Sequence, residues 1–110
     1  MQPDHPVLRV LESRRADGTL VVSVEGEVDL ATAPTLARQF ERIFDRADTV
    51  LVDLRRVHFL DCVGLRELLC LHEDGLERGC RVGFVQGPES VRRVFELTGT
   101  LSRLSFAEAA

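Results

Sequence analysis

The sequence of 110 residues contains no lysine, tyrosine, tryptophan or asparagine, so all 14 of its basic residues are arginine. Without lysine there is no Walker-type phosphate-binding lysine, no Schiff-base lysine and no serine/lysine dyad. The six aromatic residues are all phenylalanine, and the net charge is -4. This composition does not suit a basic groove that tracks phosphates and stacks bases. Several enzyme classes are therefore excluded, and we expect no nucleic-acid partner.

Long apolar runs are also missing. The longest run, from Leu68 to Leu71, has four residues, whereas a membrane-spanning helix needs about 20. The first ten residues carry Asp4 and His5 between prolines, where a secretory leader needs an apolar stretch. We therefore expect a cytoplasmic protein with no membrane insertion, folded as a single domain over residues 1–110 with an ordered core at about 7–106.

Cysteine and histidine are few and widely spaced. The cysteines Cys62, Cys70 and Cys80 form no C-x-x-C pair, and three is an odd number for a disulfide framework, so we expect reduced thiols. No two histidines stand at a spacing typical of zinc ligands, and neither a metal nor a cofactor is expected. His58 precedes Cys62 by four residues, but no third group that would orient a base is evident. We therefore do not expect an enzyme.

The first part of the chain has the pattern of a hairpin followed by a helix. Strands are expected over residues 7–13 and 20–24, joined by a turn at 16–18. Gly26 is expected to end the second strand, and Thr32 is a candidate N-cap for a helix whose apolar residues recur at helical spacing.

The remainder of the chain alternates between strand and helix patterns. The expected elements are a strand at 50–54, a loop at 55–62, a helix at 63–78, a strand at 81–86, a helix opening at 87–90, a strand at 101–106 and a frayed stub at 107–110. Gly79 and Gly99 are expected to end the two helices, and Leu97 is expected on a buried helix face with Val91, Val94 and Phe95. This β-β-α-β-α-β-α-β order predicts an α/β fold with a mixed central sheet packed with helices.

Two loops follow predicted strands at the edge of the sheet where open α/β folds carry their functional residues. One contains Asp29, which is a candidate to close the turn after Gly26. The other leads into the second helix, where Asp61 is a candidate N-cap because carboxylates are stabilised at helix amino ends. Asp53 is expected at a strand end, bonded to loop amides, and Ser90 in the first turn of the third helix.

Four sequence blocks, in this order and with this spacing, resemble the STAS domain of bacterial anti-sigma factor antagonists. They are Gly26-Glu27-Val28-Asp29 with Thr32-Ala33, Val52-Asp53-Leu54, Phe59-Leu60-Asp61-Cys62-Val63-Gly64-Leu65, and Val91-Arg92-Arg93-Val94-Phe95-Glu96-Leu97-Thr98-Gly99. The resemblance extends over nearly the whole chain, from about Val7 to Phe106. It implies a STAS-type domain that binds an anti-sigma factor with kinase activity and so frees a sigma factor.

The resemblance also implies which residues meet that partner. They are Asp29, Asp61, Cys62, Val63, Gly64 and Leu65. In the family pattern, Asp-Ser-(Ser/Thr)-Gly-Leu, the serine after the aspartate accepts a phosphate that ends the interaction. Here that position holds Cys62, and the next residue is Val63, which has no hydroxyl. Phosphoserine would add about 1.5 to 2 negative charges beside Asp61. We therefore hypothesise that phosphorylation does not switch this chain there.

Other interpretations remain open for the same residues. The chain could serve as a STAS adaptor subunit of a transporter or a signalling scaffold. Cys62 could act as a redox-responsive thiol, since the helix dipole lowers a thiol pKa while the adjacent Asp61 raises it. It could also be a small half-buried residue that replaces serine without a new role.

Overall fold

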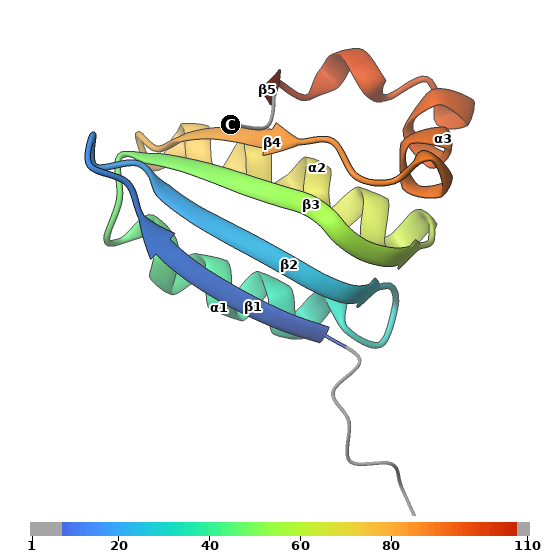
Figure 1. The fold of residues 1–110 in the computed structure, drawn as a ribbon, viewed down its shortest axis with the longest axis horizontal. Helices are drawn as coiled ribbons and strands as arrows, with labels where there is room; N and C mark the ends of the chain where they lie inside the picture. The colour runs from blue at the N-terminus through green and yellow to red at the C-terminus, as the bar shows by residue number, and fades with distance from the viewer. Residues whose placement is uncertain (1–7, 108–110) are drawn as a thin grey trace, which may run out of the picture.

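The computed structural model describes residues 8–107, and its five strands form one mixed sheet (Figure 1). The strands are β1 (Leu8–Arg14), β2 (Leu20–Val28), β3 (Thr49–Leu60), β4 (Arg81–Val85) and β5 (Phe106–Ala107). They lie side by side in chain order, with β1 antiparallel to β2 and all other neighbours parallel. The predicted fold class is confirmed, while Val7 of the predicted first strand falls outside the described residues.

Three α-helices connect the parallel strands. They are α1 (Ala33–Phe44), α2 (Cys62–Glu77) and α3 (Glu89–Thr98), and a 3-10 turn, η1 (Leu101–Arg103), precedes β5. Helices α1 and α2 lie behind the sheet in Figure 1, whereas α3 lies beyond the end of β4. The predicted element order is confirmed. No helix in residues 8–107 is long and apolar enough to cross a membrane.

Alternate residues of the central strands point toward α1 and α2. These inward residues are Leu20, Val22 and Val24 of β2 and Val50, Val52 and Leu54 of β3, all of them buried. They pack with Phe40 of α1 and Leu68 of α2 in one apolar core, and full burial of each such side chain contributes about 1.5 to 3 kcal/mol. The opposite face of β2, with Val21, Ser23 and Glu25, is only partly buried.

Strands β2 and β3 are longer than the sequence predicts. Residues 55–60, expected as a loop, continue β3 to Leu60, and β2 continues past Gly26 to Val28. The register between the two strands shifts twice, and Gly26 takes a φ of 107° close to one shift. Such bulges interrupt the two-residue alternation from which a strand is recognised, so the sequence pattern concealed this extension.

The end of the chain also differs from the prediction. Within residues 8–107, only Phe106 and Ala107 form the last strand, because the preceding residues turn in η1. In this turn the Arg103 N–H donates to the Thr100 carbonyl at 2.9 Å. Ala107, expected in a frayed stub, thus belongs to β5, and residues 108–110 lie outside the described range. Leu97 is 79% exposed, since it stands about 200° around the helix from the buried Phe95.

Candidate functional site

Asp61 caps the amino end of α2, as predicted. Its Oδ1 accepts a hydrogen bond from the Gly64 N–H at 2.8 Å, and its own N–H donates to the Val28 carbonyl at 3.3 Å. The helix begins at Cys62, one residue earlier than expected. The cap therefore holds the start of α2 against the carboxyl end of β2.

Gly64 permits this contact because it has no side chain. A β-carbon at this position would lie 2.6 Å from the carbonyl carbon of Val28 and closer still to its oxygen. Gly64 is buried, and so is Leu65, which is 5% exposed. These two predicted partner-binding residues therefore support the segment from within, and Cys62 and Val63 are the ones exposed to solvent.

Asp29 closes the turn that leads from β2 into α1. Its Oδ1 accepts hydrogen bonds from the N–H groups of Ala31 and Thr32, each at 3.0 Å. Thr32 is the residue before α1, but its hydroxyl donates to the Glu27 carbonyl at 2.8 Å and does not cap the helix. The turn-closing interpretation is confirmed, while contact between Asp29 and a partner stays a prediction.

The two loops meet. The Leu30 N–H donates to Oδ2 of Asp61 at 3.4 Å, which joins the loop after β2 to the start of α2. Leu30 is 70% exposed, Phe59 near the end of β3 is 50% exposed and Val63 is 39% exposed. We call Leu30, Phe59, Cys62 and Val63 the loop-end surface. Its apolar character at the end of a sheet is typical of an interaction site.

Leu30 and Phe59 were not singled out from the sequence. An apolar residue next to a strand is usually buried, and only the packing of the loops shows that these two are not. The sequence did contain one indication that Leu30 is exposed. It lies in the loop between Asp29 and Ala31, before the helical spacing of apolar residues begins at Thr32. Phe59 opens the sequence block before the second helix that carries the family resemblance, but it was not among the predicted partner-binding residues.

The three cysteines are free and differ in exposure. Cys62 is exposed, Cys70 is half-buried and Cys80 is buried. Burial raises the pKa of Cys70, and nearby Glu67 and Asp74 raise it further. Burial also raises the pKa of Cys80, with a smaller effect from Asp48. Cys62 is thus the most accessible thiol, and it lies at the amino end of the second helix, where the sequence predicted it.

Neither a catalytic pair nor a metal centre emerges from the side chains at residues 8–107. Within this range no hydrogen bond links the exposed His58 to Cys62. The same range contains no cluster of three histidine, cysteine or acidic residues that could hold a metal ion. Ser90 lies in the first turn of α3, as expected, and is exposed.

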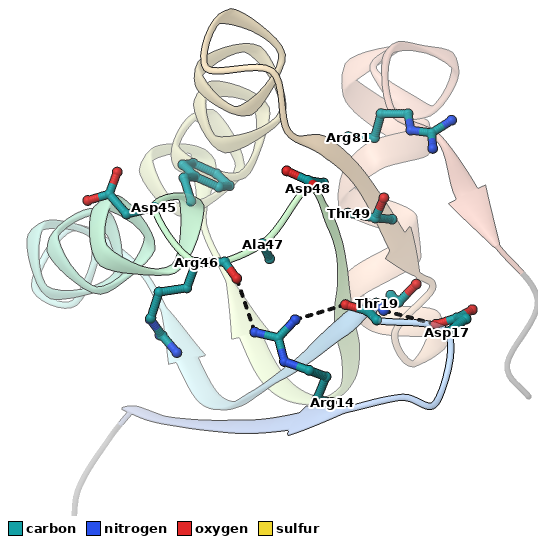
Figure 2. Close-up of a pocket in the computed structure, with 11 residues that line it drawn as sticks. Arg14, Asp17, Thr19, Asp45, Arg46, Ala47, Asp48, Thr49 and Arg81 are labelled. Atoms are coloured by element: carbon teal, nitrogen blue, oxygen red, sulfur yellow. Dashed lines mark hydrogen bonds between the residues drawn. The ribbon is translucent and has the colours of Figure 1, made fainter.

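An open hollow of about 670 Å³ lies at the opposite end of the sheet, where β2, β3 and β4 begin. Arginine and aspartate residues line it in equal number (Figure 2). The guanidinium of Arg14 donates to the carbonyls of Gly18 at 2.9 Å and Arg46 at 3.1 Å, and Arg46 pairs with Glu12 at 3.0 Å. These charges hold the turn and the end of α1 in place, so we do not take the hollow as the functional site.

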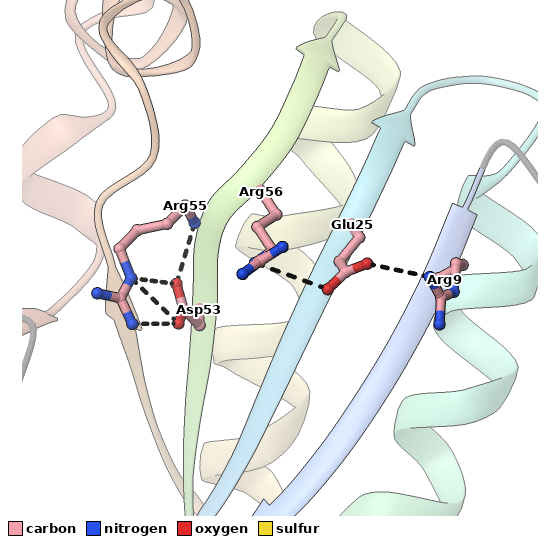
Figure 3. Close-up of polar contacts among 5 residues, drawn as sticks. All are labelled: Arg9, Glu25, Asp53, Arg55 and Arg56. Carbon is pink, nitrogen blue, oxygen red and sulfur yellow. Dashed lines mark hydrogen bonds and ion pairs between the residues drawn. The ribbon is translucent and has the colours of Figure 1, made fainter.

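A row of charges crosses the face of the sheet that is turned away from α1 and α2 (Figure 3). Glu25 of β2 lies between Arg9 of β1, at 3.6 Å, and Arg56 of β3, at 3.8 Å. Beside them, Arg55 pairs with Asp53 at 2.8 Å. We call these five residues the charged row.

Asp53, a member of this row, has a position and hydrogen-bond partners that differ from those predicted. It lies within β3 and not at a strand end, and its Oδ1 accepts from the Arg55 backbone N–H at 3.0 Å, so no loop amide is involved. Hydrogen bonds from the Arg55 side chain lower the pKa of Asp53, although partial burial acts in the opposite direction.

Comparison with known proteins agrees with the observed fold. The sequence model of the STAS domain family matches residues 10–109 of this chain. The anti-sigma-F factor antagonist RsfB of Mycobacterium tuberculosis is 32% identical over 84 residues, which are 76% of this chain and 68% of that protein. The chain therefore belongs to the STAS domain family.

Solved structures extend the likeness. The crystal structure of an anti-sigma factor antagonist from Mycobacterium paratuberculosis superposes with a TM-score of 0.79 and 32% identity, over 93% of this chain and 86% of that one. Unphosphorylated SpoIIAA, an anti-sigma factor antagonist, superposes with a TM-score of 0.71 over 93% and 89% of the two chains; at 20% identity, this shows the fold alone. The chain is an anti-sigma factor antagonist-like STAS protein, and antagonists of this kind are non-enzymatic regulatory proteins.

Proposed function

We propose that this protein binds an anti-sigma factor through the loop-end surface and thereby releases a sigma factor. The observation that carries the proposal is the hydrogen bond from Leu30 to Asp61, which joins two loops into one surface with exposed apolar side chains. The 32% identity to two anti-sigma factor antagonists supports the choice of partner. The protein acts in the cytoplasm, as a single STAS domain without a cofactor.

The mechanism is competition for a surface. Leu30, Phe59 and Val63 expose apolar area that a partner would remove from water, which favours association by about 25 cal/mol per Å². Asp29 and Asp61 have their carboxylates tied into the turn and the cap, so both loops are ordered before the partner arrives. A preorganised surface loses less conformational entropy when it binds.

Cys62 keeps this surface in one state. It is exposed at the first position of α2, beside the Asp61 carboxylate. A serine at this place could accept a phosphate of about 1.5 to 2 negative charges and repel a partner. The thiol of Cys62 and the side chain of Val63 offer no hydroxyl, so a serine kinase does not switch the protein off here.

The binding proposal is tested with purified kinase-like anti-sigma factors from the same cell by titration calorimetry. Replacing Leu30 with aspartate should raise the dissociation constant about tenfold or more. A leucine side chain buried at an interface contributes about 1.5 to 3 kcal/mol to the free energy of binding. Leu97→Asp is the matched control, since Leu97 is also a highly exposed leucine, at 79%, but lies on α3. Equal affinities for wild type and Leu30→Asp, or no binding at all, would contradict the proposal.

The proposal about Cys62 is tested separately with the kinase and labelled ATP. The wild-type chain should take up no label at residues 62 or 63, whereas Cys62→Ser should be phosphorylated at the new hydroxyl. A phosphate on wild-type residue 62 or 63 would overturn this part of the proposal. Unlabelled Cys62→Ser that still binds the kinase would show that more than the acceptor atom has changed.

A further inference from the structure

The charged row offers more positive than negative charge to solvent. The side chains of Arg9, Arg55 and Arg56 are 56%, 54% and 73% exposed, whereas those of Glu25 and Asp53 are only 19% and 12% exposed. The carboxylates therefore lie against the sheet, and the guanidinium groups extend outward. On a chain with a net charge of -4, this is a local concentration of cationic groups.

These arginines have hydrogen-bonding capacity to spare. Each guanidinium has five N–H donors, and Arg56 approaches Glu25 only to 3.8 Å, while Arg9 approaches it to 3.6 Å. The two longer pairs that Glu25 makes with exposed Arg9 and Arg56 contribute little to stability, so within the row only the Arg55–Asp53 pair is explained as a stabilising feature of the fold. Exposed guanidinium groups suit carboxylate partners, which they bind in a planar, two-point manner.

The surroundings of the row are partly apolar. Leu11 of β1 lies opposite Ser23 of β2 in the register and is 43% exposed. In Figure 1 neither α1 nor α2 reaches this face of the sheet. Arginine is enriched in protein interfaces relative to the rest of the surface. Glu27, opposite Phe59 in the register, is an exposed carboxylate that lies outside the charged row, between it and the loop-end surface.

We propose that this open sheet face binds an acidic segment of a partner protein, with carboxylates on Arg9, Arg55 and Arg56 and an aliphatic side chain on Leu11. Charge complementarity selects this occupant. A second copy placed face to face would bring guanidinium groups against guanidinium groups, which is repulsive. Arg56 precedes Phe59 of the loop-end surface by three residues, about 10 Å along β3. The face is therefore a second docking surface, which adjoins the loop-end surface but shares no residue with it.

The test is an NMR titration of the full ¹⁵N-labelled chain with a decaglutamate peptide, with a decaglutamine peptide as the neutral control. Decaglutamate should cause saturable shifts centred on β1, β2 and β3 at the charged row, and added salt should weaken them. The double variant Arg9→Gln/Arg56→Gln should weaken binding by about fivefold or more. The control Arg93→Gln/Arg103→Gln removes two exposed, ion-paired arginines elsewhere and should leave binding unchanged.

Four outcomes would overturn the proposal. The first is chemical shift changes centred on α3 or on the hollow near Arg14, and the second is equal weakening of decaglutamate binding by both double variants. The third is the same chemical shift changes with decaglutamine. The fourth is concentration-dependent shifts of the chain alone, which would indicate that a second copy binds this face. Thermal melting of each variant shows that it is folded. The Leu30→Asp variant should bind decaglutamate normally, so a failure of the anti-sigma factor proposal is distinguished from a failure of this one.

Discussion

Replacing Gly64 with alanine should destabilise the protein, although the same change in an exposed helix stabilises it by about 1 kcal/mol. The reason is the close approach of α2 to β2. A β-carbon would lie 2.6 Å from the carbonyl carbon of Val28 and 2.9 Å from its Cγ1, well inside normal van der Waals separation. Because part of this obstacle is backbone, a side-chain rotation does not remove it.

The magnitude follows from what must move. Overpacking of this kind costs about 1 to 3 kcal/mol, and displacing the start of α2 also strains the 2.8 Å cap from Gly64 to Asp61, a cap being worth about 1 kcal/mol. After the gain in helix propensity of about 1 kcal/mol, the net loss is about 1 to 3 kcal/mol. For a domain of this size that corresponds to a melting temperature lower by about 4 to 20 °C.

Thermal and urea unfolding, followed by circular dichroism, measure this loss. Val63→Ala is the matched control, because Val63 is the neighbouring residue in the same helical turn and is 39% exposed; its stability should change by less than about 0.5 kcal/mol. If Gly64→Ala is as stable as the wild type, the close approach of α2 to β2 does not determine the need for glycine, and the reasoning is refuted.

Two further predictions concern titratable groups. The lowered pKa of Asp53 stabilises the fold above the unfolded carboxyl pKa of about 3.9, and this contribution disappears as the pH falls through the lower folded value. Asp53→Asn should therefore flatten the acid dependence of urea unfolding between about pH 2 and 5; an unchanged slope contradicts this. With a thiol reagent at mildly alkaline pH, Cys62 should react first and buried Cys80 only on unfolding; rapid labelling of Cys80, identified by peptide mass spectrometry, would disprove the order.

Local patterns were sufficient for much of the fold. Helical spacing and the cap at Asp61 predicted α2 to within one residue, because a capping hydrogen bond involves residues only three apart. Gly99 ends α3 in the left-handed conformation, as predicted, with a φ of 72°. Features of this kind depend on a few neighbouring residues, which the sequence shows directly.

Features that depend on distant segments could not be predicted in this way. The extension of β3 to Leu60 depends on bulges formed against β2, and the need for Gly64 depends on Val28, 36 positions earlier. The charged row required the register that places Arg9, Glu25 and Arg56 side by side. The exposure of Leu30 likewise follows from how two loops pack together, and no single segment encodes it.

Among residues 8–107, strand β1 is at one margin of the sheet, and within this range no other strand pairs with its outer backbone groups. Its seven residues include Arg9, Glu12 and Arg14, all exposed. If β1 strands from many copies stacked in register, as in a fibril, each of these side chains would adjoin its own duplicate, and like charges would repel along the whole stack. The same strand that supplies Arg9 to the charged row thereby opposes in-register stacking of its own copies.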